Sequence, residues 1–312
     1  MGNKQHSLIS VILPVYNGGR ELATSIESIL SQTYSHFELL ISLDGCTDNS
    51  EKIIKKYSDN RIKLFNYQNN VGLGCNLNRL IFHTSKDTEY IAIAEQDDYY
   101  YPNRLELQVE YLIENQAKGM VSGIAEFYDG KKVSFLFPGL LASGKTYPIG
   151  KDMFLLNYMN QTKVVNSCMM FRKKTHIDNG FYFTTHHPNI AIDWAYYLRF
   201  SLVSQIGGLN EILVRLDRRP ERNSITKNRT NYNAAARELL KNFKYEFPNI
   251  ISRKHYRYAL NTQRLIELGH YAGVLFILYI TLYIFTNPFE KRYYYYLIKR
   301  VKRFFRETDD II

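Results

Sequence analysis

The first hundred residues alternate between short apolar runs of strand length and segments with helical spacing. The strand-like runs are Ile9–Leu13, Phe37–Leu43, Ile62–Asn66 and Tyr90–Ala94. Helical spacing occurs between them, over Arg20–Ser31, over Glu51–Tyr57 and after Gly72. Strands that alternate with helices of roughly 10 residues are typical of βαβ units. We therefore expect an α/β fold with a mostly parallel central sheet flanked by helices.

Polar residues follow three of these runs at the point where each predicted strand ends. They are Tyr16 and Asn17, then Asp44, then Glu95–Asp98. In open α/β sheets, ligands bind outside the carboxyl ends of the strands. Carboxylates there are costly to bury unless they are paired or bind a cation, and a hard divalent ion with phosphate oxygens suits them. The sequence therefore predicts a cation site at this edge of the sheet.

Net charge, cysteine content and the N-terminal residues limit the classes of partner and the cellular compartment that we expect. The 312 residues carry a formal net charge of +10, which suits anionic partners such as nucleic acid, sugar nucleotides or an acidic membrane face. The cysteines, Cys46, Cys75 and Cys168, are odd in number and far apart, which argues against a disulfide framework and a zinc site. The first residues, 1–7, are polar and contain no apolar signal region, so we expect a cytoplasmic protein.

The C-terminal part has a different pattern. Tyr271–Thr286 is a continuous apolar run, shorter than the ~20 residues that a spanning helix needs. The segment 291–306 is rich in Tyr, Lys and Arg, and on a helix its apolar side chains share one face. Those side chains are Tyr294, Leu297, Ile298, Val301, Phe304 and Phe305. Such a helix suits the headgroup zone of an anionic bilayer, and the alternative is that these helices pack on the protein itself.

Four motifs occur in a fixed order within roughly the first 110 residues. They are Val11–Asn17, Leu43–Asp48, Asn70–Leu73 and Glu95–Asp98, the last followed by Pro102–Leu105. Their order, spacing and strand context resemble the signature of family 2 glycosyltransferases of the GT-A fold. The resemblance implies a nucleotide-sugar donor, Mg²⁺ or Mn²⁺ as cofactor, and usually inversion at the anomeric carbon.

By this resemblance, Asp44 accepts a hydrogen bond from the imide N–H of uracil, which a carboxylate can do because it only accepts. Tyr16 stacks on the base, and Pro14, Asn17 and Gly72 also belong to the nucleotide site. The alternatives are that Asp44 forms a turn or caps a helix, and that Tyr16 is a half-buried tyrosine at a strand end.

Asp97 and Asp98 match the acidic motif of the family. The resemblance assigns the metal to Asp98, and to Asp97 either the ribose or a share of the metal. The family often has Asp where this chain has Glu95, whose role is therefore open. The alternative for the whole cluster is a solvated acidic turn.

Two further residues come from the second half of the family pattern. Asp193, ahead of a predicted helix over Trp194–Leu202, corresponds to the catalytic base, although Ile192 replaces the second acid of the usual pair. Its alternative is a helix N-cap. Arg219, with Arg218 and Arg222, resembles the segment that closes over the donor phosphates, although the usual His is missing. The alternative is a solvated basic loop.

Two patterns are not taken as sites. Residues 139–146 match the P-loop pattern, but Pro148 follows where a P-loop needs a helix. The adjacent pair His186-His187 points to opposite sides of an extended chain, so we interpret it as part of a loop near the acceptor site.

The sequence thus predicts a nucleotide-sugar-binding half over 1–115, an acceptor-binding half over 116–230 and a membrane-associated helical region over 231–312. We expect transfer from a nucleotide-sugar, in particular a UDP-sugar, to a glycan or polyprenyl-diphosphate-linked acceptor in O-antigen or capsule synthesis. The protein would lie peripherally on the inner face of the cell membrane. The alternatives are a catalytically inactive GT-A-fold binding protein and a nucleic-acid binder. We expect no nucleic acid as partner, because the basic residues concentrate in the tail beside an apolar run.

Overall fold

The computed structural model of the protein describes residues 7–137, 147–162, 164–184, 191–219 and 229–309. The chain divides into two compact units, one made of residues 1–157 and 162–228 and the other of residues 158–161 and 229–312. The P-loop-like pattern, the pair His186-His187 and Arg222 lie outside the described residues.

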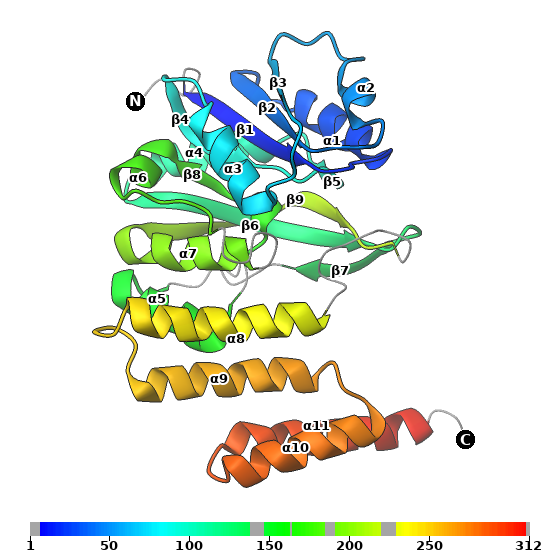
Figure 1. The fold of residues 1–312 in the computed structure, drawn as a ribbon, viewed down its shortest axis with the longest axis vertical. Coiled ribbons are helices and arrows are strands. Elements are labelled where there is room, and N and C mark those ends of the chain that lie inside the picture. The colour runs from blue at the N-terminus through cyan, green and yellow to red at the C-terminus, as the bar shows by residue number, and fades with distance from the viewer. Residues whose placement is uncertain (1–6, 138–146, 163, 185–190, 220–228, 310–312) are drawn as a thin grey trace. The chain divides into compact units, whose positions relative to one another are not determined.

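A single mixed sheet forms the centre of the first unit (Figure 1). Nine strands of the described chain belong to it, in the order β3-β2-β1-β4-β8-β6-β9-β5 with β7 paired to β6. Their bounds are β1 Leu8–Val15, β2 Phe37–Asp44, β3 Ile62–Tyr67, β4 Thr88–Ile93, β5 Asp98–Tyr100, β6 Lys118–Tyr128, β7 Val133–Phe137, β8 Met170–Arg172 and β9 Gln205–Asp217. The strands β3, β2, β1 and β4 are parallel, whereas β8, β5 and β7 run antiparallel to their neighbours. The predicted α/β class is confirmed.

Helices cover both faces of this sheet. The helices α1 (Glu21–Leu30) and α4 (Arg104–Glu114) share one apolar core with Val11 and Leu13 of β1. The helices α3 (Leu73–Phe82) and α7 (Ile192–Val203) share the other core with Ile12. Neighbouring side chains of a strand point to opposite faces of the sheet. A strand whose residues are all apolar therefore has both faces covered. The shorter helices are α2 Ser50–Ile54, α5 Gly150–Asn160, η2 Asn166–Cys168 and α6 Lys173–Asp178.

The strands β5 and β9 were not predicted, and the end of β9 pairs with β5 at the acidic motif. The motif does not end in a turn, because Asp98 begins the short strand β5. β5 pairs antiparallel with the end of β9, where Asp98 lies opposite Leu216. β9 also pairs parallel with β6, so its backbone has partners on both sides. These two pairings extend the sheet through a segment whose own composition does not favour a strand.

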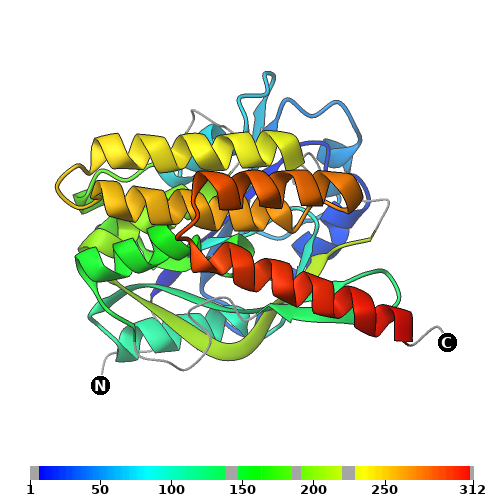
Figure 2. The same ribbon diagram turned by 90° about the horizontal axis from the view of Figure 1, so that it is seen from below.

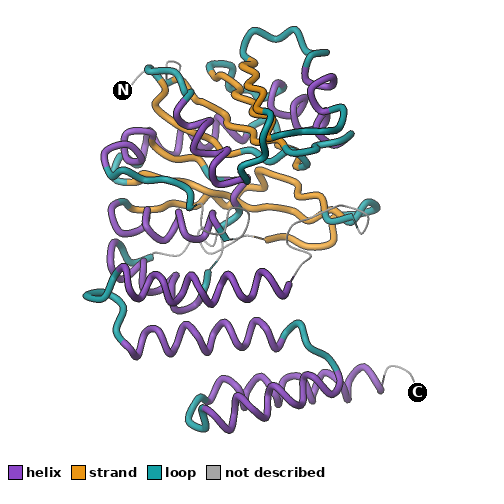
Figure 3. The backbone as a smooth tube through the Cα atoms, viewed as in Figure 1, coloured by secondary structure: helices purple, strands orange, loops and turns teal. Residues whose placement is uncertain are grey.

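The second unit is built of helices and connecting loops (Figures 2 and 3). Its helices are α8 Arg229–Glu246, α9 Arg253–Leu268, α10 Gly273–Thr286 and α11 Lys291–Asp309. A capping box starts α9, where the Ser252 hydroxyl accepts from the amide of His255 at 3.1 Å. None of the described helices combines the length and the apolar character needed to cross a bilayer.

Glu38 is a buried carboxylate of β2, distant in sequence from the motifs. It accepts hydrogen bonds from Lys63 Nζ and Ser10 Oγ, both at 2.5 Å, and from Ser85 N at 2.9 Å. Burial alone raises the pKa of Glu38, but these hydrogen bonds outweigh it and lower the pKa to about 2.

This lowered pKa predicts how stability depends on pH. The folded-state pKa lies below the ordinary value of 4.5, so Glu38 stabilises the fold above that pH and loses this effect as the pH falls toward about 2. We expect Glu38→Gln to lower the free energy of unfolding by about 2 kcal/mol at neutral pH, less as the pH falls below about 4. Urea unfolding across that pH range measures this. The exposed Glu106→Gln serves as control, and a deficit that stays constant with pH would contradict the assignment.

Candidate active site

The loop after β1 is fastened to the acidic motif. The amide of Tyr16 donates to Gln96 Oε1 at 2.8 Å, and Gln96 Nε2 donates back to the Tyr16 carbonyl at 3.1 Å. The Tyr16 side chain is 51% exposed, so its ring offers a face for stacking. Asn17 adopts φ 49° and accepts from the amide of Thr47 at 2.8 Å, which joins the ends of β1 and β2. Pro14 is buried inside β1.

Asp44 is buried at the end of β2 and braces the start of α3. Its carboxylate accepts from the amides of Val71 and Gly72, each at 3.0 Å. Arg79 lies 3.5 Å away and forms an ion pair with it. Gly72 has φ 87°, a conformation that favours glycine. These donors use most of the acceptor capacity of a carboxylate, and base recognition by Asp44 stays a prediction.

Arg79 was missed by the sequence reasoning. It stacks over the ring of Tyr67 at 4.3 Å while it pairs with Asp44. Its spacing from Gly72, two turns along α3, could have indicated a shared face. A shallow hollow opens beside it, lined by Val71, Cys75, Asn78, Arg79, Phe82 and His83. A guanidinium therefore lies against Asp44, the residue to which the resemblance assigns the contact with the nucleobase.

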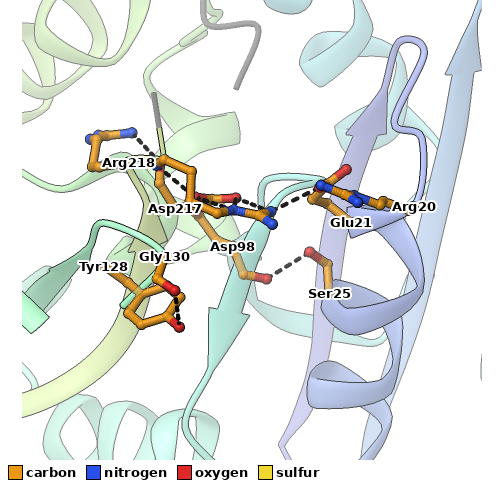
Figure 4. A network of polar contacts seen from close by, with 9 residues as sticks. Arg20, Glu21, Ser25, Asp98, Tyr128, Gly130, Asp217 and Arg218 are labelled. Carbon is orange, nitrogen blue, oxygen red and sulfur yellow. Dashed lines mark hydrogen bonds and ion pairs between the residues drawn. The ribbon is translucent and has the colours of Figure 1, made fainter. Parts of the chain in front are cut away.

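The acidic motif forms a compact cluster. One carboxylate oxygen each from Glu95, Asp97 and Asp98 lies within 4.8 Å of the others, and among the described residues this group could hold a metal ion. Asp98 is 1% exposed, which argues against a solvated turn, and its carbonyl accepts from Ser25 Oγ at 2.6 Å (Figure 4). Asn166 Nδ2 donates to Glu95 Oε1 at 2.9 Å. Hard carboxylate oxygens are the donor set that Mg²⁺ and Mn²⁺ prefer.

A buried arginine lies behind this cluster. Arg104 is fully buried, donates to the carbonyl of Ile93 at 2.8 Å and stacks over the ring of Tyr100 at 4.7 Å. The hydroxyl of Tyr100 in turn lies 2.6 Å from the amide of Glu95. Burial lowers the pKa of Arg104, and the charge of the nearby Asp98 opposes that change. Arg104 thus supplies a positive charge near Asp98 and a rigid support for the strand end that leads into the acidic motif.

Arg219 follows the end of β9, the strand that pairs with β5 at Asp98. Its guanidinium donates to Asp217 Oδ2 at 2.5 Å and to Glu21 Oε1 at 2.8 Å. The hydrogen bonds to Asp217, more than those to Glu21, raise the pKa of Arg219. Gly130 permits this position, because a Cβ there would lie 2.9 Å from Arg219 Cγ. Figure 4 shows Asp217 of β9 and Glu21 of α1 on either side of the dashed lines that mark these ion pairs.

Asp193 lies in the first turn of α7. This helix begins at Ile192, earlier than predicted, and its N-cap is Ala191 with φ 53°. The alternative of Asp193 as N-cap is therefore wrong. A carboxylate in the first turn is stabilised by the helix dipole. The catalytic role of Asp193 stays a prediction.

The comparison with known families decides the class of the protein. The family model described as glycosyl transferase family 2 matches residues 10–179, more than half of the chain. The chain belongs to glycosyl transferase family 2. The match spans the four motifs, the acidic cluster and Asn166.

Two relatives show the range of this glycosyltransferase's similarity. EpsE of Bacillus subtilis, whose name places it among glycosyltransferases, is 35% identical over 180 residues, which are 54% of this chain and 64% of EpsE. WfgD of Escherichia coli is named as a UDP-Glc:alpha-D-GlcNAc-diphosphoundecaprenol beta-1,3-glucosyltransferase. It is 34% identical over 113 residues, 36% of this chain and 44% of WfgD. The matched regions span less than two thirds of either relative.

Solved structures support the fold. TarS of S. aureus in complex with UDP-GlcNAc has a TM-score of 0.60 at 17% identity, covering 90% of this glycosyltransferase and 74% of that chain. The mannosyltransferase PcManGT from Pyrobaculum calidifontis, in complex with GDP-Man and Mn²⁺, has a TM-score of 0.57 at 12% identity. The alignment covers 94% of this chain and 86% of PcManGT. The predicted GT-A fold is confirmed.

The sequence reasoning missed four supporting residues, Arg79, Gln96, Arg104 and Asn166. Gln96 and Arg104 lie within motifs that were noticed, but their partners could not be read from the motifs. Asn166 contacts Glu95 across 71 positions of sequence, and no local signal marks it. What these residues share is support: each contacts a predicted site residue or the segment that carries one.

The position of Arg104 predicts a large effect of a small substitution. Arg104 Nε also donates to Gln108 Oε1 at 3.1 Å, and lysine cannot reproduce this planar set of bonds. We expect Arg104→Lys to lower the free energy of unfolding by about 3 kcal/mol, measured by urea unfolding. Arg20→Lys, at an exposed arginine, should change it by less than about 0.5 kcal/mol. Equal effects of the two substitutions would show that Arg104 does not support the cluster.

Proposed function

We propose that this glycosyltransferase moves a sugar from a UDP-sugar to an acceptor hydroxyl, with inversion at the anomeric carbon, in the synthesis of a surface polysaccharide. The observation that carries the proposal is the cluster of Glu95, Asp97 and Asp98 beside the carboxyl ends of parallel strands in a member of this family. That edge is where open α/β sheets bind their ligands.

The carboxylate cluster fits a divalent cation, Mg²⁺ or Mn²⁺. Asp98 and Asp97 would hold it, and Glu95 reaches the same group with its longer side chain. Such an ion, when bound, neutralises charge on a departing diphosphate. PcManGT, a structural neighbour, was solved with Mn²⁺. The presence of Glu95 within the cluster also favours an active enzyme over an inactive binding protein.

The nucleotide would lie along the ends of β1 and β2, in the half formed by residues 1–115. The exposed ring of Tyr16 would stack on the base, and Asp44 with its partner Arg79 would contact the edge of the base. Arg219, two residues beyond the end of β9 that pairs with β5, would donate to the diphosphate. The choice of uridine is supported by WfgD, named for UDP-Glc, and by TarS, solved with UDP-GlcNAc.

In the half formed by residues 116–230, Asp193 would act as the base. It would take the proton of the acceptor hydroxyl while that oxygen forms a bond to C1 of the sugar, and the bond from C1 to the diphosphate oxygen breaks so that UDP leaves. The acceptor would be a glycan on a polyprenyl diphosphate at the inner face of the cell membrane. WfgD, whose name contains a diphosphoundecaprenol-linked acceptor, and the aromatic, basic α11 support this choice.

Removing one ligand of the cation should abolish turnover. We expect Asp98→Asn to lower Mn²⁺ affinity and UDP-sugar turnover by about 100-fold or more. EDTA, which removes the ion, should lower the turnover of the parent to a similar extent. Calorimetric Mn²⁺ binding and UDP release measure the two. Glu106→Gln, at an exposed position of α4, removes the same charge outside the cluster and should retain both. Full turnover by Asp98→Asn would overturn the metal assignment.

The base should be separable from donor binding. Asp193→Asn removes the proton acceptor, so we expect transfer to fall by about 100- to 10,000-fold while the Kd for UDP with Mn²⁺ stays within about twofold. Proton NMR of the product gives the anomeric configuration in the same assay. If Asp193→Asn still transfers sugar at the parent rate, the general base lies elsewhere. If the product keeps the anomeric configuration of the donor, the reaction is not a single inverting displacement.

A further inference from the structure

The second unit presents an apolar surface on helix α10. This helix has no charged residue along its 14 positions, and one side of it, with Phe276, Ile280 and Tyr283, packs into the core of the unit. Several apolar side chains on the other side point outward, and Val274 and Phe285 are 81% and 83% exposed. We call this exposed set the α10 face. It comprises Val274, Leu275, Ile277, Leu278, Leu282 and Phe285.

Polar contacts fix which side of α10 is exposed. The hydroxyl of Tyr283 donates to Glu267 of α9 at 3.4 Å, and Glu267 is buried and paired with Arg237 of α8. At the end of α10, Asn287 Oδ1 accepts from Arg257 Nη2 at 3.2 Å. The helix cannot rotate its apolar face inward without breaking these hydrogen bonds and removing Phe276 and Ile280 from the core of the unit. The α10 face is therefore a property of the fold.

A basic helix adjoins this face. α11 packs on α10 through Tyr293 and Tyr296. Figure 2 shows α10 in orange and α11 in red. Outward from this contact lie the exposed lysines Lys291, Lys299 and Lys302. Exposed apolar and aromatic side chains lie among them, namely Tyr294, Tyr295, Ile298 and Val301. The sequence predicted membrane association for residues 231–312 and an apolar face on α11, and that face is divided because Leu297 packs inward.

We propose that the α10 face inserts at the boundary between headgroups and acyl chains of an anionic bilayer, and that the lysines of α11 bind lipid phosphates. At 14 residues α10 is about 21 Å long, less than the ~30 Å hydrocarbon core, so it lies in the plane of the surface. An uncharged face beside lysines and tyrosines has the charge and polarity of such an interface. This inference deepens the proposed function, on which it rests for a lipid-linked acceptor.

Flotation of the full chain with vesicles tests the proposal. We use phosphatidylcholine alone and phosphatidylcholine with about one third phosphatidylglycerol, and expect binding chiefly to the anionic vesicles. Leu278→Glu with Phe285→Glu should reduce that binding at least about tenfold. Lys299→Gln with Lys302→Gln should reduce it about fivefold per lysine, and only for anionic vesicles. Tyr245→Glu on α8 places the same charge at another exposed aromatic position and should bind as the parent does.

Two results would overturn the docking surface. One is unchanged vesicle binding by Leu278→Glu with Phe285→Glu. The other is a dimer of the parent, seen by analytical ultracentrifugation and lost in Phe285→Glu, with no vesicle binding; the α10 face would then be covered by a second copy.

UDP release in solution, measured on the same samples, separates this inference from the proposed function. The α10 variants should release UDP as the parent does. A parent that binds vesicles through α10 but releases no UDP would contradict the proposed function and leave the docking surface intact.

Discussion

Three carboxylates whose oxygens lie within 4.8 Å of one another repel, and the architecture of the first unit compensates for that repulsion. Arg104 places one positive charge behind the cluster, and Tyr100 and Asn166 hold the backbone and side chain of Glu95. A divalent cation bound by these oxygens would offset the repulsion that remains, and this is the role that we propose for so costly a group at the rim of the sheet.

The sequence was informative where burial alone determines structure. The strands β1 to β4 are apolar runs with polar ends, because parallel strands are covered on both faces, and their bounds differ from the prediction by one or two residues. It was uninformative for β5 and β9. A strand of three residues has no measurable periodicity, and β9 contains Gly207, Gly208 and Asn210. Its pairing with β6 and β5, which is a tertiary effect, makes it a strand.

The same division holds at the site. Tyr16, Asp44 and Asp98 could be grouped in advance because the carboxyl ends of neighbouring parallel strands meet at one edge. Arg104 could not be recognised as buried, because arginine is mostly exposed and nothing local distinguishes this one. Asn166 depends on how η2 packs behind β4, and Arg219 depends on the pairing of β9 with β5. Supporting residues thus follow from packing, whereas the candidate site residues Tyr16, Asp44 and Asp98 follow from strand ends.

The two units bring complementary electrostatics to the proposed reaction. The carboxylates of the first unit suit a cation, which would in turn bind a diphosphate. The lysines beside the α10 face suit an anionic surface. The α10 face contains no titratable or nucleophilic group, so docking would leave the chemical step unchanged. It would instead raise the effective concentration of an acceptor confined to the same membrane. Loss of docking should therefore appear in KM for a lipid-linked acceptor, with kcat preserved, since no contact made only in the transition state is removed.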